Sequence, residues 1–270
     1  MHQAVTSTTQ DAAAIAALAA RLDSAALAAR ATAQLTADHP GLTLADAYRI
    51  QRALIERRVA RGEQVVGVKM GFTSRAKMAQ MGVSDLIWGE LTDAMEIADG
   101  GELDFARFIH PRIEPEIAFR LKTRLTGAID TAAAAAAIEA IAPAMEVIDS
   151  RYADFRFDLV DVVADNSSSA AFVIGAWTAP MSDYAHFDMT MCFDGAAVQR
   201  GSTAAILGDP LMSLVEAVRL VGQSGRALEA GTIVLCGAAT SAEPLRSRVA
   251  VSLDAGALGT ARLRVVGGGS

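Results

Sequence analysis

The most informative stretch of this chain is His110-Pro111-Arg112-Ile113-Glu114-Pro115-Glu116-Ile117-Ala118-Phe119. Its apolar residues predict a largely buried strand, in which side chains two residues apart point to the same face. Glu114 and Glu116 would then project together. Adjacent carboxylates repel each other and burial adds a desolvation cost, so such a pair is stable when a cation lies between them. Oxygen ligands favour Mg²⁺ or Mn²⁺ over zinc. The alternative is an exposed strand face that carries two acids.

A third carboxylate occurs in a similar setting. Glu146 lies inside the apolar run Pro143-Ala144-Met145-Glu146-Val147-Ile148, and a buried glutamate is rare unless it is paired or bound to a metal. A solvated strand face is again the alternative. Together, Glu114, Glu116 and Glu146 would form a three-carboxylate metal site with open positions for a substrate.

Lys69 is the candidate cationic side chain of such a site. It lies in the run Val65-Val66-Gly67-Val68-Lys69-Met70-Gly71, where a lysine either snorkels from an edge strand or is held in a site. Buried beside a metal ion, its pKa would fall, and the lysine could then carry a proton. The glycines would let the backbone approach a ligand closely, but the run lacks the Gly-Lys-Ser/Thr ending of a phosphate loop.

Composition limits the classes of function. The 270 residues are 52% hydrophobic and carry a formal net charge of −7, which excludes a disordered chain and argues against a nucleic-acid partner. Two distant cysteines, Cys192 and Cys236, predict a reducing compartment rather than a disulfide framework. The polar N-terminus has no hydrophobic signal core, and no apolar stretch is long enough to span a membrane. We therefore expect a soluble, cytoplasmic protein with no membrane partner.

Apolar periodicity predicts four helices, at residues 11–33, 44–61, 131–141 and 211–221. Thr43 would cap the second helix and Thr131 the third. Asp209 would cap the fourth, with Pro210 at its first position. Four arginines of the second helix are expected on its solvent face: Arg52, Arg57, Arg58 and Arg61.

Short β-branched runs between Gly, Asp and Ser turns predict strands at residues 65–70, 113–121, 160–164, 171–174, 189–193, 232–236, 248–253 and 260–266. Many short strands with few helices predict an α+β fold rather than a regular βαβ alternation. We expect an N-terminal helical segment, residues 1–62, followed by a β-rich catalytic domain, residues 63–270.

Five segments occur in an order that resembles a known family: residues 67–74, 80–83, 111–117, 146–151 and 162–168. They read Gly-Val-Lys-Met-Gly-Phe-Thr-Ser, Gln-Met-Gly-Val, Pro-Arg-Ile-Glu-Pro-Glu-Ile, Glu-Val-Ile-Asp-Ser-Arg and Val-Val-Ala-Asp-Asn-Ser-Ser. The likeness is to the 2-keto-4-pentenoate hydratase / 4-oxalocrotonate decarboxylase family of the fumarylacetoacetate hydrolase superfamily. It extends from about residue 44 to residue 266.

The resemblance implies a mixed β-roll core preceded by an N-terminal helical segment. It also implies a divalent metal, Mg²⁺ or Mn²⁺, held by the residues that match Glu114, Glu116 and Glu146. The usual family pattern of the acid pair is Glu-Ala-Glu, whereas this chain has Pro115 in the middle. A proline removes one backbone donor, so a local shift of the strand is expected.

The same resemblance assigns roles to other residues. The family's lysine matches Lys69 and its active-site serine matches Ser168, and these two are the expected catalytic residues. Ile87, Asn166 and Phe72 are the expected substrate contacts. The segment that contains Asn166 and Ser168 is otherwise an ordinary polar turn at the end of a strand.

Two kinds of feature favour the decarboxylase branch of the family. Hydratase members carry an acidic residue where this chain has Ile87. Decarboxylase members share Lys-Met-Gly, Thr-Ser-x-Ala-Lys-Met and Phe-Asp-Leu-Val-Asp-Val-Val-Ala-Asp-Asn, which occur here at residues 69–71, 73–78 and 157–166. The expected enzyme is a lyase of aromatic meta-cleavage catabolism that decarboxylates 4-oxalocrotonate (2-oxohex-3-enedioate) to 2-hydroxypenta-2,4-dienoate.

Two alternatives stay open. One is a 2-keto-4-pentenoate hydratase with the same metal and fold. The other is a non-catalytic subunit that partners such a hydratase, although the intact acids and Lys69 count against it. The expected partners are a small dicarboxylate substrate, further copies of the chain in a homo-oligomer, and a sister 2-hydroxypentadienoate hydratase.

Overall fold

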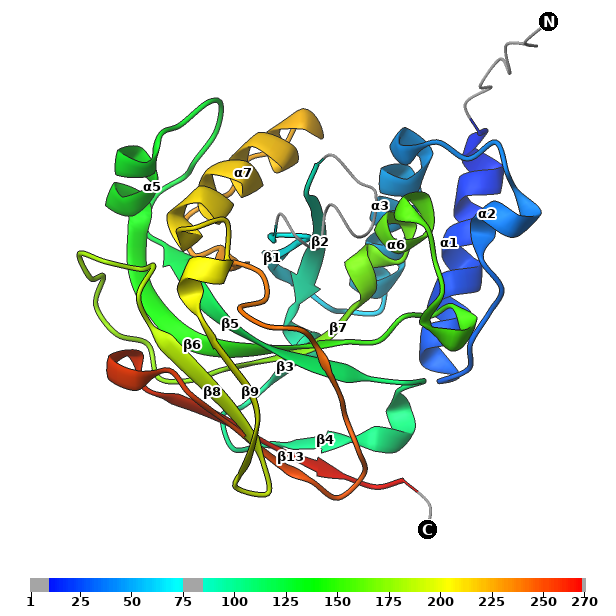
Figure 1. Ribbon diagram of the computed structural model, residues 1–270. Coiled ribbons are helices and arrows are strands. Elements are labelled where there is room, and N and C mark those ends of the chain that lie inside the picture. Colours follow the sequence, from blue (N-terminus) through cyan, green and yellow to red (C-terminus); the bar gives the residue numbers. More distant parts are fainter. Residues whose placement is uncertain (1–9, 75–84, 269–270) are drawn as a thin grey trace, which may run out of the picture.

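The structure is a computed structural model that describes residues 10–74 and 85–268. The family segment at residues 80–83, and residues 75–78 of the decarboxylase pattern, lie outside the described residues. Both predicted kinds of element, an N-terminal group of helices and a β-rich remainder, are present (Figure 1). The predicted α+β class is therefore confirmed.

The strands form two sheets. The larger sheet has eight strands in the order β2-β1-β10-β5-β6-β7-β3, with β11 paired to β5. The smaller sheet has five strands in the order β4-β13-β12-β8-β9. The strands of the larger sheet are β1 (Val65–Gly71), β2 (Ile87–Thr92), β3 (Glu96–Ile97), β5 (Arg112–Leu121), β6 (Ile138–Ile148), β7 (Ser169–Ile174), β10 (Ile233–Leu235) and β11 (Glu243–Pro244). Those of the smaller sheet are β4 (Glu102–Asp104), β8 (Asp188–Phe193), β9 (Ala196–Ser202), β12 (Ala250–Asp254) and β13 (Thr260–Val266).

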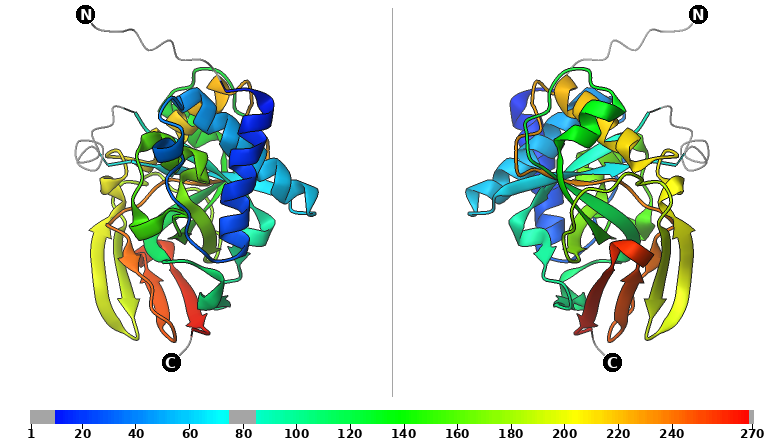
Figure 2. Two further views of the ribbon diagram at one scale, coloured as in Figure 1. Left: turned by 90° about the vertical axis from the view of Figure 1, so that its right-hand side faces the viewer. Right: turned by 90° about the vertical axis from the view of Figure 1, so that its left-hand side faces the viewer.

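One hydrophobic core joins the two sheets. Ile113 and Ile117 of β5 contribute to it from the larger sheet, and Leu253 of β12 and Leu263 of β13 contribute from the smaller one. Figure 2 shows the strands of the smaller sheet side by side at the lower end of the molecule, near the C-terminus. Because this core takes one face of β5, the other face of β5 is left for the functional side chains.

The helices cover the remaining sides of the larger sheet (Figure 1). They are α1 (Ala12–Leu27), α2 (Leu35–Asp38), α3 (Leu44–Ala60), α5 (Thr131–Ala137), α6 (Leu159–Ala164) and α7 (Pro210–Gln223). Thr43 caps α3 in a reciprocal pair with Asp46, and Asp209 caps α7 with Pro210 in its first turn, as predicted. Among the described residues, no helix is both long and apolar enough to cross a membrane.

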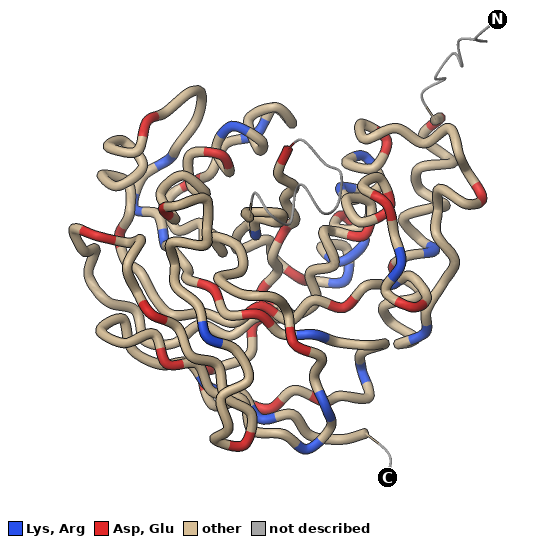
Figure 3. The backbone as a smooth tube through the Cα atoms, viewed as in Figure 1, with Lys and Arg blue, Asp and Glu red and all other residues tan. Residues whose placement is uncertain are grey.

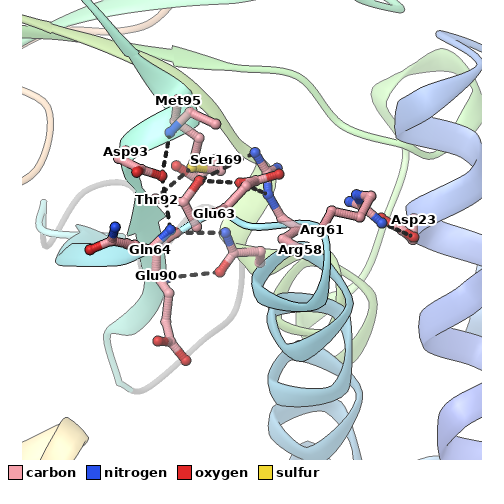
Figure 4. Close-up of polar contacts among 12 residues, drawn as sticks. Asp23, Arg58, Arg61, Glu63, Gln64, Glu90, Thr92, Asp93, Met95 and Ser169 are labelled. Atoms are coloured by element: carbon pink, nitrogen blue, oxygen red, sulfur yellow. Dashed lines mark hydrogen bonds and ion pairs between the residues drawn. The ribbon is translucent and has the colours of Figure 1, made fainter.

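Three arginines of α3 and its C-cap do more than face solvent. Arg57 and Arg61 donate to the buried carboxylate of Asp23 on α1 at 2.9 and 2.8 Å. Burial alone would raise the pKa of Asp23, but the hydrogen bonds from the two arginines outweigh it and lower the pKa. Arg58 donates to Glu63 at 2.7 Å, and Glu63 accepts from Thr92 of β2 (Figure 4). These pairs fasten α3 to α1 and to the edge of the larger sheet.

The N-terminal helices also share a hydrophobic cluster with the rest of the chain. Leu22 of α1 and Ile50 of α3 lie in one cluster with Ile87 of β2 and Val163 of α6. The division of the chain at residue 62 stays a prediction, but the helices before it support the wall on which Ile87 lies.

The prediction of a strand at residues 160–164 is wrong, because this segment forms the helix α6. Asp158 accepts from the backbone N–H of Asp161, and Asp161 in return accepts from the backbone N–H of Asp158. This reciprocal cap, together with packing of Val162 and Val163 against the N-terminal helices, outweighs the β-propensity of the valines. The segment at residues 165–169 consequently follows a helix, not a strand.

Two further differences concern where helices end. The helix predicted at 131–141 stops at Ala137 and is capped by Asp130 rather than Thr131. From Ile138 onward the chain pairs with β5 as the buried strand β6. The hydrogen bonds to this distant strand stabilise the extended conformation, and the alanine-rich local sequence does not reveal them. The helix predicted at 11–33 ends at Leu27, and the chain beyond it forms a bridge between Thr32 and Tyr152.

Pro115 does not shift its strand, contrary to the expectation. The register of β5 with β6 is continuous from Arg112 to Arg120, with Pro115 opposite Met145. The Pro115 carbonyl instead accepts from Ala239 N at 2.9 Å. In an antiparallel strand the N and C=O of one residue point to the same side, so the missing N–H is on the side away from β6. The proline therefore removes no hydrogen bond between β5 and β6.

Close approach of backbones fixes the position of β1. This strand, which carries Lys69, runs parallel to β10, with Gly67 opposite Ile233. A Cβ atom on Gly67 would lie 2.2 Å from the Ile233 carbonyl oxygen. No side chain fits there unless the two strands separate.

We expect Gly67→Ala to lower the free energy of unfolding by about 1–3 kcal/mol, the usual scale for overpacking. Urea denaturation is the measurement. Gly41→Ala is the matched control, since no atom lies within 4 Å of a Cβ at that position. Equal stability of the two variants would show that the β1–β10 contact does not limit this position.

Candidate metal and active site

Three glutamates meet on the face of β5 and β6 that points away from the main core. Glu114 lies directly opposite Glu146 in the antiparallel pair, and Glu116 follows two residues later on the same face. One oxygen from each carboxylate lies within 4.8 Å of those of the others, and the residues are 8%, 0% and 0% exposed for Glu114, Glu116 and Glu146. Figure 3 shows acidic positions gathered at the centre of the molecule, where these strands run.

Among the described residues, few protein groups compensate the carboxylates of Glu116 and Glu146. Glu116 Oε2 accepts from Gly237 N at 2.8 Å, but its buried Oε1 has no hydrogen-bond partner among the described residues. Burial raises the pKa of Glu116 well above its usual range, and the charges of Glu146 and Glu114 raise it further. Burial also raises the pKa of Glu146 to about 6 against the opposing effect of Lys69. A buried, oxygen-only donor set with an unused lone pair fits a hard divalent cation.

Lys69 lies against this cluster. Its Nζ is 2.9 Å from Glu146 Oε2 and donates to the Ser167 carbonyl at 3.0 Å, and the residue is buried. Burial alone would lower the pKa of Lys69, but the charges of Glu146, Glu114 and Glu116 outweigh it and raise the pKa. The sequence predicts a lowered pKa beside a metal ion.

A strained turn carries Ser168 to the site. Asn166, Ser167 and Ser168 have φ values of 52°, 53° and 58°, in the left-handed region that non-glycine residues avoid. Arg151 holds the turn at both ends, since it donates to the Asp165 carboxylate and carbonyl and to the Ser169 carbonyl. Strained backbone of this kind persists only where the surroundings enforce it, and it gathers at functional sites.

A cavity of about 290 Å³ opens beside the carboxylate cluster. Its lining includes five of the residues that the sequence singled out: Lys69, Phe72, Ile87, Glu114 and Ser168. The Ser168 hydroxyl is buried and has no hydrogen-bond partner among the described residues. The cavity thus combines a charged end, a free hydroxyl and an apolar wall in one space.

The remaining three predicted residues do not line the cavity. Glu116 and Glu146 lie in the cluster next to Glu114. Asn166 uses its amide on the backbone of Glu90 in β2: its Oδ1 accepts from Glu90 N at 2.8 Å and its Nδ2 donates to Glu90 O at 2.9 Å. This arrangement gives Asn166 a role in holding β2, the strand of Ile87, and its contact with a substrate stays a prediction.

Sequence reasoning gave no site role to several side chains of the cavity wall, among them Arg112, Phe155 and Phe157. The guanidinium carbon of Arg112 lies 4.4 Å from the centroid of the Phe155 ring. A signal for Arg112 was present, because it precedes Glu114 by two residues and so shares its strand face. No local signal marks Phe155, since it belongs to an irregular segment between β6 and α6.

Residues 66–266 match the family model described as fumarylacetoacetate (FAA) hydrolase C-terminal, and the chain therefore belongs to the FAA hydrolase family. Within that family it is 54% identical over 250 residues to a 4-oxalocrotonate decarboxylase from Pseudomonas sp, an alignment that covers 93% of this chain and 97% of the relative. It is also 39% identical over 222 residues to the 2-hydroxyhexa-2,4-dienoate hydratase of Comamonas testosteroni, covering 80% of this chain and 84% of that enzyme.

A solved structure agrees with these relatives. The 4-oxalocrotonate decarboxylase from Pseudomonas putida G7, complexed with magnesium and adipate, matches with a TM-score of 0.93 and 38% identity, over 96% of this chain and 99% of that one. The predicted family and its β-roll type of fold are thereby confirmed. The relatives are decarboxylases and hydratases, both of which are lyases.

The carboxylate cluster predicts a stabilising metal. We expect Mg²⁺ to raise the Tm of the wild-type chain and a chelator to reverse the rise, because an ion that binds only the folded state stabilises it. Glu116→Gln should remove most of this rise while the metal-free variant still folds, since it buries one charge fewer. Thermal unfolding with and without Mg²⁺ is the measurement. Glu139→Gln is the control on β6, where an exposed carboxylate should be irrelevant to the metal. An equal Mg²⁺ effect on both variants would contradict a metal at this cluster.

Proposed function

We propose that this chain is a metal-dependent 4-oxalocrotonate decarboxylase of aromatic meta-cleavage catabolism. It converts 2-oxohex-3-enedioate into 2-hydroxypenta-2,4-dienoate and CO₂, with Mg²⁺ or Mn²⁺ held by Glu114, Glu116 and Glu146. The observation that carries the proposal is a buried carboxylate cluster that adjoins a cavity with both a cationic Lys69 and an apolar Ile87 in its wall. The 54% identity to a decarboxylase over 93% of the chain supports it.

The reaction follows from the connectivity of the substrate. The bond between C5 and the distal carboxylate breaks, and its electron pair moves through the alkene until the 2-oxo oxygen carries the negative charge. When bound, the metal supplies a Lewis acid for the 2-oxo acid end of the substrate. Lys69 offers a proton or a positive charge where the enolate charge develops, and the unpaired Ser168 hydroxyl offers a further donor.

The apolar wall selects decarboxylation over hydration. Ile87 is 3% exposed and lines the cavity, so it supplies neither a base for water nor a charge near the departing carboxylate. Hydration of the dienol needs a positioned and activated water molecule. The second candidate function is nevertheless a hydratase, because the hydratase relative is 39% identical over 80% of this chain.

The proposal extends to partners and location. The product of the decarboxylation is the substrate of a 2-hydroxypentadienoate hydratase, so transfer between the two enzymes favours a complex with that sister enzyme. We also propose a homo-oligomer in the cytoplasm, where both free cysteines, Cys192 and Cys236, stay reduced. Native mass spectrometry of the chain alone and with the co-expressed hydratase tests both assemblies, and a monomer in each sample would refute them.

We expect the purified chain to release CO₂ from 2-oxohex-3-enedioate in the presence of Mg²⁺. Lys69→Met should lower kcat by about 100-fold or more, the scale of a general acid–base group, while Mg²⁺ still raises the Tm. The measurement is CO₂ release alongside product spectra. Lys122→Met, which removes an exposed lysine, is the control and should retain full activity. An unchanged kcat in Lys69→Met would make Lys69 structural, and a wild type without CO₂ release would refute the decarboxylase.

The role of Ile87 is tested separately. Ile87→Asp should depress decarboxylation, because a second negative charge near the departing carboxylate opposes its binding. Ile87→Leu keeps an apolar wall and should retain most of the activity. Each protein is given the diacid and, in a second assay, 2-hydroxypenta-2,4-dienoate. If the wild type hydrates the dienol faster than it decarboxylates the diacid, the hydratase alternative replaces the decarboxylase.

A further inference from the structure

Arg112 is an unpaired cation in the wall of the cavity. In residues 10–74 and 85–268 it forms no ion pair, and its guanidinium lies over the Phe155 ring at 4.4 Å. Arg120 of the same strand offers a comparison. It also lies over an aromatic ring, Trp177 at 4.8 Å, but it pairs with Glu139 at 3.1 Å. A cavity arginine with no carboxylate of its own is available to a carboxylate of the ligand.

Its position suits the far end of a diacid. Arg112, Glu114 and Glu116 alternate on one face of β5, and residues two apart on a strand are separated by about 6.8 Å. The 2-oxo acid end of the substrate belongs at the carboxylate cluster, because that is where a metal would bind it. A six-carbon diacid extended from there along the cavity brings its second carboxylate to the neighbouring same-face position, which is Arg112.

Phe155 fixes the guanidinium at that position. The φ values of Asp154 and Phe155 are both 57°, an unfavourable backbone conformation that directs the Phe155 ring into the cavity wall. His110 packs against the same ring with a centroid distance of 5.1 Å. The ring therefore has neighbours that restrict its movement, and Arg112 is held over it by cation–π attraction.

We propose that Arg112, positioned by Phe155, binds the distal carboxylate of the diacid and so distinguishes the dianionic substrate from its monoanionic product. The identity of the diacid rests on the proposed function. The pair stabilises a carboxylate that the reaction removes, so it contributes to binding and not to loss of CO₂. Once CO₂ has left, the product has no group for Arg112 and is released more easily.

A matched pair of ligands tests the proposal without turnover. Both 2-oxoadipate and 2-oxohexanoate present the same 2-oxo acid to the metal, and only the former has a distal carboxylate. We expect the Mg²⁺-loaded wild type to bind 2-oxoadipate about tenfold to a hundredfold more tightly, the scale of a charge-assisted hydrogen bond. Arg112→Met should abolish this preference and leave the Kd of 2-oxohexanoate unchanged. Isothermal titration calorimetry measures the four Kd values, one for each ligand with each protein.

Arg120→Met is the matched control, because it removes an arginine from the same strand outside the cavity and should keep the preference. A preference that survives in Arg112→Met, or a wild type with none, would overturn the proposal. So would an equal loss of affinity for both ligands in Arg112→Met, which would indicate general damage to the site.

Kinetics separate this inference from the proposed function. With the natural diacid, Arg112→Met should raise KM by about tenfold or more with kcat unchanged or higher, the signature of lost ground-state binding. A fall in kcat at constant KM would contradict the assigned role. If the wild type releases no CO₂ yet the ligand preference depends on Arg112, the decarboxylase is refuted and the diacid site stands.

Discussion

Three carboxylates buried within 4.8 Å of one another impose the main energetic cost that the surrounding structure has to offset. Such a group is unfavourable in a low-dielectric interior, because each charge loses its water and repels the others. The chain reduces that cost with specific contacts: Lys69 against Glu146, the Ser169 hydroxyl on Glu146, and the Gly237 N–H on Glu116. These contacts are too few to complete the hydrogen bonding of Glu116, and a divalent cation is the chemical group that would do so.

The surrounding fold holds the elements of the site in place rather than adding charge to it. The buried pair of Arg151 and Asp165 fixes the turn that carries Ser168, and burial raises the pKa of Asp165 to about 6 against the attraction of Arg151. The N-terminal helices hold the opposite wall. Gln51 of α3 donates to the Trp88 carbonyl at 2.9 Å and to the Val163 carbonyl at 3.1 Å, which ties β2 to α6 behind the cavity.

The cavity is therefore chemically divided, and the division matches the proposed reaction. One end adjoins the three acids and contains Lys69, so a cation held by the acids and the Lys69 ammonium would stabilise negative charge on a 2-oxo acid there. The wall around Ile87 is apolar, which suits the release of a neutral gas molecule from a charged group. Arg112 also lines the cavity, on the same face of β5 as Glu114, and supplies a charge of the opposite sign.

Features that depend on residues close together in the chain could be predicted from the local sequence. Alternation along residues 112–119 placed Glu114 and Glu116 on one face, and the caps at Thr43 and Asp209 were readable because a cap is a local hydrogen bond. The ordered family segments then indicated the fold, and they predict the three glutamates as metal ligands and Lys69 as a catalytic residue. These are the parts of the site that the order of neighbouring residues can predict.

Features that depend on distant partners became visible in the folded chain. Residues 138–148 became a strand because β5 was available to pair with them, and residues 159–164 became a helix because a reciprocal cap and a shared core outweighed valine's preference for strands. The side-chain amide of Asn166 forms hydrogen bonds with the backbone of Glu90, 76 residues away. Phe155 has a backbone in the left-handed region, and its ring lies against the guanidinium of Arg112. In each case, long-range pairing or packing provides a free energy that local propensity does not contain.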